Sequence, residues 1–171
     1  EEEKEEKNGE ENYDEGLTEL ESHFLSSSSS SNTNVPNIRP GIIHRLDVET
    51  SGVMIVALNK DTLKNMQLEF RERRVGKWYL TLVEGNCVSN GRLSNYISRD
   101  PKERRRFRVT PENGVKDEKK KGKHAVSEYE PLGYCKNRNV SLVRVRIMTG
   151  RTHQIRVHMK HVGHPVVGDE M

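Results

Sequence analysis

Cysteine, aromatic residues and long apolar runs are scarce in this 171-residue sequence. Its two cysteines, Cys87 and Cys135, stand alone without CxxC spacing, which argues against a disulfide framework or a zinc knuckle and indicates reduced thiols in an intracellular protein. No apolar run approaches the roughly 18 residues that a membrane span needs, so we expect no membrane partner. Hydrophobic residues make up 32% of the chain and aromatic residues 5%, so one domain with a lean core is expected.

Charge is distributed unevenly along the chain. The first 25 residues hold eleven Asp and Glu against two lysines, whereas the remaining residues hold 27 Lys and Arg against 15 Asp and Glu. A basic body of this kind is typical of proteins that meet polyanions such as nucleic acids. Lysine-rich surfaces also serve solubility alone, so composition by itself leaves both interpretations open.

Composition also divides the chain into two segments. Residues 1–38 are acidic and then rich in serine and asparagine, and we expect them to be disordered because they bury too few apolar side chains to offset the entropy of ordering. Residues 39–171 are expected to form one domain. Two helices are predicted from apolar residues at helical spacing, over about 61–74 with Asp61 as cap and over about 153–162 with Thr152 as cap.

Strands are predicted wherever apolar residues alternate with polar ones. The segments with this pattern are residues 42–46, 53–58, 77–85, 127–132 and 141–148. In the last of these, the valines and isoleucine face one way and two arginines the other, which predicts one buried and one wet, basic side. Residues 86–124 are predicted to be mainly loop.

Asp47 lies at a corner of the predicted fold. The apolar stretch 42–46 leads into it, and a Thr50-Ser-Gly turn follows, an arrangement that presents a carboxylate at the edge of a cleft. His44 and Arg45 precede it, and Arg45 shares its face of the strand, so the guanidinium would keep the carboxylate ionised and oriented as a nucleophile needs. Two plainer interpretations stay open, namely that Asp47 caps a turn and that Arg45 contacts phosphate without catalytic duty.

Two further features suit nucleic-acid binding. The run RDPKERRRFR, residues 99–108, has few acids and contains Phe107, which favours phosphate binding over a merely solvated surface. Its six basic residues are Arg99, Lys102, Arg104, Arg105, Arg106 and Arg108. Tyr79, in the alternating stretch KWYLTLVEG, is either a core residue or a platform on which a base stacks.

The C-terminal stretch carries four histidines, His153, His158, His161 and His164. No carboxylate or thiolate stands at a recognisable ligand spacing from them, and HExxH is absent, so we predict no metal. Hydrogen bonds to backbone groups or to phosphates are expected instead.

Three motifs in order, GIIHRLDVETSG, KWYLTLVEG and TGRTHQIRVHMKHVGHPVVGD, resemble RNA pseudouridine synthases of the RluA family over residues 39–171. The resemblance implies an α+β fold with a mixed, mainly antiparallel sheet and flanking helices, the pseudouridine synthase catalytic-domain fold. It implies isomerisation of selected uridines in structured RNA to pseudouridine, with no cofactor and no metal. The family's usual Lys-Pro-x-Gly motif is not present and the chain stops at GDEM, so we expect the domain to be incomplete at both ends.

The resemblance also assigns roles to residues. It implies that Asp47 is the covalent catalyst, that Tyr79 stacks on the flipped uracil and moves a proton, and that Arg156 pairs with Asp47. Arg45 is expected to hold the target nucleotide out of its stack, and Ile155 to pack beneath the base. The candidate RNA-binding residues are His44, Arg45, Thr50, Arg99, Arg104, Arg105, Arg106 and Ile155.

The expected partner is structured RNA. The segments ISRDPKERRRFRV and GKHAVSEYEPL resemble the branch that modifies large-subunit ribosomal RNA, so ribosomal RNA is favoured and transfer RNA is the alternative. We expect a monomer in the cytoplasm or in an RNA-containing organelle. A catalytically incomplete RNA-binding protein derived from the family is the competing hypothesis.

Overall fold

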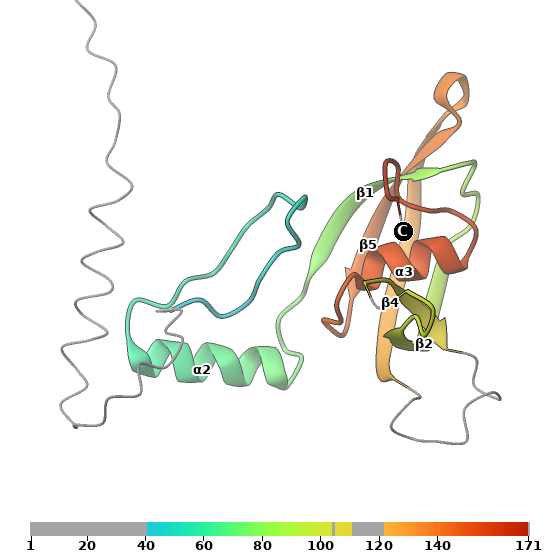
Figure 1. Ribbon diagram of the computed structural model, residues 1–171. Helices are drawn as coiled ribbons and strands as arrows, with labels where there is room; N and C mark the ends of the chain where they lie inside the picture. The colour runs from blue at the N-terminus through green and yellow to red at the C-terminus, as the bar shows by residue number, and fades with distance from the viewer. Residues whose placement is uncertain (1–40, 104, 111–121, 171) are drawn as a thin grey trace, which may run out of the picture. The chain divides into compact units, whose positions relative to one another are not determined.

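The computed structural model describes residues 41–103, 105–110 and 122–170, which fall into two compact units divided between Glu72 and Arg73 (Figure 1). The segment 1–38, expected to be disordered, lies outside the described residues and stays a prediction. No helix of the described ranges is long and apolar enough to cross a membrane.

The N-terminal unit consists of a long loop followed by helix α2 (Lys60–Arg71). The two strands predicted over 42–46 and 53–58 were wrong, because the backbones of these arms form an isolated bridge between Ile42 and Val56 and a bond from the Ala57 amide to the Gly41 carbonyl instead of a strand ladder. Gly41 has φ of +72°, and a Cβ there would lie 2.2 Å from the Ala57 oxygen, so the close approach of the arms requires glycine.

Helix α2 begins and ends earlier than predicted. Asn59, not Asp61, is the N-cap, and its side-chain oxygen accepts from the Thr62 amide at 2.8 Å. The helix ends at Arg71 because Arg73 takes a left-handed conformation with φ of +59°.

The second unit is built on a five-stranded sheet in the order β1-β5-β4-β2-β3, with every pair antiparallel (Figure 1). The strands are β1 (Trp78–Glu84), β2 (Gly91–Arg99), β3 (Phe107–Thr110), β4 (Lys123–Cys135) and β5 (Val140–Ile147). The α+β fold class with an antiparallel sheet is therefore confirmed. The prediction of mainly loop over 86–124 was wrong for 91–99 and 107–110, where β2 and β3 lie, and its residues 111–121 lie outside the described residues.

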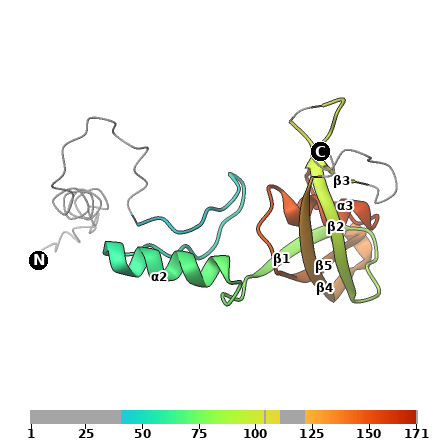
Figure 2. The same ribbon diagram turned by 90° about the horizontal axis from the view of Figure 1, so that it is seen from below.

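Helix α3 (Gln154–His161) lies across one face of this sheet (Figures 1 and 2). Met159 packs there with Val83 of β1 and with Val143 and Val145 of β5, and all four side chains are at most 1% exposed. The opposite face of β5 carries Arg144 and Arg146, so the predicted division into a buried side and a basic side is confirmed.

The outer face of the sheet exposes apolar side chains beside ion pairs. Trp78 and Leu80 of β1 are 57% and 67% exposed. The guanidinium groups of Arg144 and Arg146 lie 5.3 Å and 5.4 Å from the centre of the Trp78 ring. Because neighbouring strand residues point to opposite faces, Tyr79 must lie on the α3 side.

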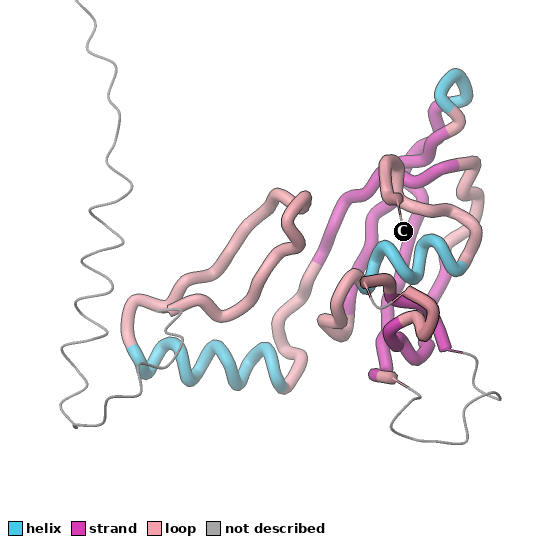
Figure 3. The backbone as a smooth tube through the Cα atoms, viewed as in Figure 1, coloured by secondary structure: helices cyan, strands magenta, loops and turns pink. Residues whose placement is uncertain are grey.

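The β4–β5 hairpin extends beyond the other strands (Figure 3). Its tip is a 3-10 turn, η1 (Lys136–Arg138), followed by Asn139 in a left-handed conformation with φ of +51°. The Tyr134 hydroxyl donates to the Asn139 side-chain oxygen at 2.9 Å, which ties the two sides of the tip together. Cys135 at this tip is exposed and Cys87 is buried, and both are free thiols.

A buried polar network joins α3 to β4. Thr152 is not the helix cap: His153 holds that position with φ of +54°, and the Gln154 side chain accepts from the Arg151 amide at 3.0 Å instead. His158, which is fully buried, has its Nδ1 2.9 Å from the Ser127 hydroxyl. Neutral histidine suits this site because a charge buried here would lose its hydration.

The protein is expected to lose stability as the pH falls because of His158. Burial, and less strongly the charge of His161, lowers the pKa of His158 from 6.5 to about 4. Between these values the unfolded chain binds a proton that the folded protein does not, so stability is full above about pH 6.5 and declines towards pH 4. The loss attributable to this residue is about 3 kcal/mol, on the scale of 1.36 kcal/mol per pH unit.

Urea unfolding between about pH 7 and about pH 4 measures this slope. We expect His158→Gln to flatten it, whereas His161→Gln, on the exposed side of the helix, removes only the smaller cause and leaves most of it. A full slope retained in His158→Gln would contradict the assignment.

Candidate active site

Asp47 opens a tight turn at the tip of the N-terminal loop. The Thr50 amide donates to the Asp47 carbonyl oxygen at 2.9 Å, so backbone atoms close the turn. Asp47 is part-exposed and the next residue, Val48, is 99% exposed. The turn thus leaves Asp47 partly accessible, as a residue that acts on a substrate must be.

His44 and Phe70 hold the arms of this loop against α2. His44 Nε2 accepts from the Ile55 amide at 3.1 Å, and its ring stacks on Phe70 with the centroids 5.2 Å apart. His44, predicted to bind RNA, therefore has an internal structural role. Arg45 lies in the same loop with an exposed side chain, but outside any strand, so its shared face with Asp47 stays a prediction.

Tyr79 and Ile155 share one neighbourhood in the second unit. Tyr79 lies opposite Val145 in the β1–β5 pairing, and Ile155 is in the first turn of α3. Both pack as partly buried side chains against the core cluster that includes Met159 and Val83. The structure thus brings together a part-buried aromatic ring and a branched apolar residue, which suits a surface for a planar base.

Arg156 is held by Asp169. Its Nε donates to Asp169 Oδ2 at 2.8 Å and its Nη2 donates to Oδ1 at 2.5 Å, a bidentate pair. The Asp169 side chain is 5% exposed and that of Arg156 is 32% exposed. Sequence reasoning gave Arg156 a different carboxylate, Asp47, which lies in the other unit, so that pairing stays a prediction.

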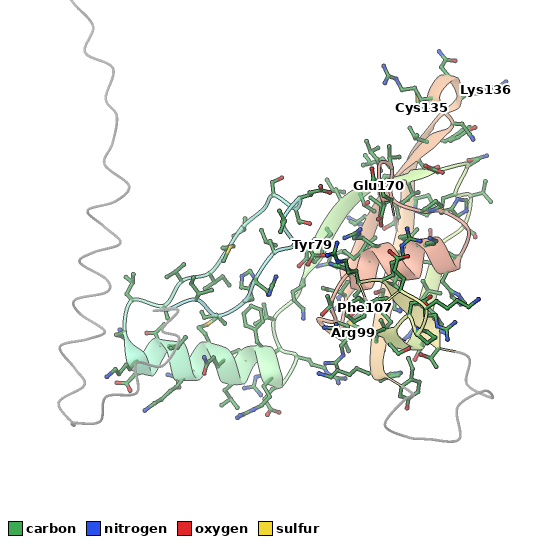
Figure 4. The ribbon with its side chains drawn as sticks, viewed as in Figure 1. Tyr79, Arg99, Phe107, Cys135, Lys136 and Glu170 are labelled. Carbon is green, nitrogen blue, oxygen red and sulfur yellow. The ribbon has the colours of Figure 1, made fainter. Side chains whose placement is uncertain are left out.

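The arginine-rich run forms the connection between β2 and β3. Arg99 and Phe107 lie opposite each other in the β2–β3 register, with the guanidinium 5.5 Å from the ring centre (Figure 4). Phe107 also meets the His153 ring edge-on, with centroids 5.7 Å apart. Arg105 is exposed, and Arg104 lies outside the described residues.

Arg106 is engaged within the fold. Its Nε lies 3.0 Å from Glu103 Oε2, and its Nη2 donates to the Glu170 carbonyl oxygen at 3.0 Å. This arginine therefore ties the β2–β3 connection to the C-terminal segment, in addition to the RNA contact predicted for it.

Lys77, just before β1, lies among other cations. Burial first, and then the charges of Arg73 and Arg151, lower the pKa of Lys77 below its ordinary value. A Cβ on Gly150 would be 3.9 Å from Lys77 Nζ, so the turn before α3 passes close to the ammonium group. Lys77 therefore lies in a locally cationic part of the second unit.

Sequence reasoning missed Asp169, Lys77 and Arg151. Each lies inside a motif already singled out, since Lys77 begins KWYLTLVEG and the other two belong to TGRTHQIRVHMKHVGHPVVGD. The sequence signal for all three is their charge, because each is a charged residue within a motif that already supplied candidate site residues.

Two of the four C-terminal histidines, His158 and His164, bond to protein groups. His164 Nδ1 lies 2.9 Å from the Glu84 carbonyl oxygen, a backbone contact of the expected kind, and His158 pairs with Ser127. Among the residues that the structure places, no group of three or more His, Cys, Asp or Glu side chains could hold a metal ion.

Comparison with known proteins decides the family. The family model described as RNA pseudouridylate synthase matches residues 9–161. The chain belongs to this family. The resemblance to RluA-type pseudouridine synthases is thereby confirmed, and the match begins well before residue 39, where the sequence placed the start of the domain.

Relatives and solved structures agree with this family. An uncharacterized RNA pseudouridine synthase of Aquifex aeolicus is 44% identical over 132 residues, covering 77% of this chain and 39% of that protein. Ribosomal large subunit pseudouridine synthase D of Borreliella burgdorferi is 42% identical, covering 82% of this chain and 40% of that protein. The structure of human RNA pseudouridylate synthase domain containing 1 superposes with a TM-score of 0.65 at 37% identity, covering 75% of this chain and 53% of that chain. The chain thus spans about 40% of the curated relatives that it matches.

Proposed function

We propose that this RNA pseudouridylate synthase family member isomerises specific uridines in structured RNA, with ribosomal RNA as the substrate class and Asp47 as the catalyst. The family match across residues 9–161 carries the proposal. Asp47 lies within that range at the tip of a backbone-closed turn, which supports its role. Relatives from Borreliella burgdorferi and Haemophilus ducreyi that are named ribosomal large subunit pseudouridine synthase D favour ribosomal RNA.

The reaction moves the ribose from a nitrogen of uracil to carbon 5 of the same base. The glycosidic C–N bond breaks, a C–C bond forms between the ribose and carbon 5, the proton on carbon 5 is lost, and the freed nitrogen gains a proton. No electrons are gained or lost overall, so acidic, basic and nucleophilic side chains can carry out the reaction. Asp47 serves as the nucleophile or electrostatic partner at the sugar.

The target base must leave its stack before it reacts, at a cost of a few kcal/mol. Tyr79 and Ile155 are proposed to receive the uracil, since both pack as partly buried side chains against the core cluster that joins α3 to the sheet. Exposed cations of the β2–β3 connection, such as Arg105, are proposed to hold flanking phosphates.

Tritium release tests the proposal. Large-subunit ribosomal RNA and transfer RNA are transcribed with tritium on carbon 5 of uracil, and each is incubated with the full chain. We expect release from ribosomal RNA. Release from transfer RNA alone would change the substrate class, and salt-sensitive RNA binding without release from either RNA would overturn the enzymatic proposal in favour of a binding protein.

A further inference from the structure

We propose that Asp169 is a positioning residue for the isomerisation, which sets the orientation of the Arg156 guanidinium towards the target nucleotide. This inference rests on the proposed function. Asp169 occupies the edge of the guanidinium formed by Nε and Nη2, so the remaining edge, on the Nη1 side, points away from Asp169 in a fixed direction. Because the guanidinium is planar and is bound through both Nε and Nη2, its rotation about the Cδ–Nε bond is restricted.

The Asp169 carboxylate is buried and itself held in place. The backbone amide of Asp169 donates to the Val166 carbonyl oxygen at 3.0 Å across a turn in which Gly168 has φ of +78°. Its side chain is 5% exposed, so water competes little for the carboxylate oxygens. A buried carboxylate that binds a cation through two atoms is a strong charge-assisted contact, and its loss removes the bond that fixes the plane of the Arg156 guanidinium.

The segment that carries Asp169 is tied to β1, the strand of Tyr79. Val166 forms an antiparallel bridge with Val83, the Val167 amide donates to the Leu82 carbonyl oxygen at 2.9 Å, and the Glu84 amide donates to the Pro165 carbonyl oxygen at 2.8 Å. Asp169 therefore links a side chain of α3 to the backbone of β1.

The same segment is also held from the β2–β3 side. The Arg106 guanidinium donates to the carbonyl oxygen of Glu170, the residue after Asp169, at 3.0 Å. Three parts of the candidate site, namely the tyrosine strand, the arginine of α3 and the arginine-rich connection, thus meet at residues 165–170. Catalytic geometry tolerates little error, since a misplacement of about 1 Å costs about 10²-fold in rate.

Asp169→Asn tests the inference because it keeps the size of the side chain and removes its charge and one acceptor. We expect kcat for tritium release to fall about 10²-fold, with KM and the Kd for RNA changed less than about 3-fold. Asp169→Glu should recover part of kcat. Glu130→Gln is the matched control, because Glu130 receives both Nε and Nη2 of Arg144 in an exposed pair on the outer face of the sheet, and it should leave kcat unchanged.

A double-mutant cycle separates positioning from a general loss of structure. If Asp169 acts through Arg156, Asp169→Asn should add little to the defect of Arg156→Ala. Equal factors in both backgrounds, or a wild-type kcat in Asp169→Asn, would overturn the inference.

A second measurement does not require turnover. The Nε–H group of Arg156 should give a slowly exchanging NMR signal that is lost in Asp169→Asn and kept in Glu130→Gln. If the wild-type protein releases no tritium, the proposed function fails by that result alone, and the NMR signal still decides whether Asp169 orients Arg156. An unchanged signal in Asp169→Asn overturns it.

Discussion

Asp47→Asn is expected to abolish pseudouridine formation while the protein still folds and binds RNA. Asparagine has the size of aspartate but is not a nucleophile and carries no charge. Loss of a covalent catalyst lowers kcat by factors on the order of 10⁴ to 10⁶, so we expect at least about a 10³-fold fall in tritium release. The turn should survive, because its bond runs from the Thr50 amide to the backbone oxygen of residue 47.

Asp61→Asn provides the control for this experiment. Asp61 is an exposed carboxylate in the same unit, in the first turn of α2, where it does not serve as the cap. We expect it to keep full activity at a cost of a few tenths of a kcal/mol in stability, the size of a surface helix-dipole contribution. Equal turnover by wild type and Asp47→Asn would show that Asp47 is not the catalyst.

Those parts of the fold with regular apolar alternation could be predicted from the sequence. In β5, Val143, Val145 and Ile147 alternate with arginines, and the structure buries the first set and exposes the second. In β1 the alternation places Tyr79 and Trp78 on opposite faces. These strands were found because their apolar residues recur with a period of two, which is enough to define a strand even though Thr81 and Ser141 also face inward.

Strand β2 was missed because its inward side is not uniformly apolar. Leu93, Asn95 and Ile97 point inward, and the Asn95 side-chain oxygen is buried, which interrupts the pattern. Strand β3 has only four residues and follows an arginine-rich run, so its composition resembles a solvated loop. Pairing with neighbouring strands, rather than local preference, makes both segments extended.

The candidate site was predicted unevenly for a related physical reason. Motif residues are local, so Tyr79, Ile155 and Arg156 could be chosen from the sequence. The bond between Arg156 and Asp169 depends on the chain turning back after α3 and running along β1, which no local pattern specifies. Arg106 likewise meets Glu170 across 64 positions of sequence.

Among the substitutions, the largest stability effect is expected from Gln154→Met. Gln154 is only 3% exposed, and both the oxygen and the nitrogen of its side-chain amide form hydrogen bonds. It accepts from Thr149 Oγ1 at 2.7 Å and from the Arg151 amide at 3.0 Å, and it donates to the Val126 carbonyl oxygen and to Ser127 Oγ, both at 2.9 Å. One side chain thus joins the turn before α3 to strand β4.

Methionine fills a similar volume but satisfies none of these groups. Each buried polar group left without its partner costs about 1–3 kcal/mol, and Val126 keeps a bond from the Met148 amide, so we expect a total loss of about 3 kcal/mol. For a unit of this size that corresponds to a fall in Tm of roughly 15 °C, measurable by circular dichroism. Gln67→Met, at an exposed position of α2, should stay within about 0.5 kcal/mol of wild type. A loss of stability from Gln154→Met as small as that from Gln67→Met would mean that packing alone, without the amide bonds, fixes α3 on the sheet. A much larger loss confined to Gln154→Met would show that the buried amide holds in place the helix that carries Ile155 and Arg156.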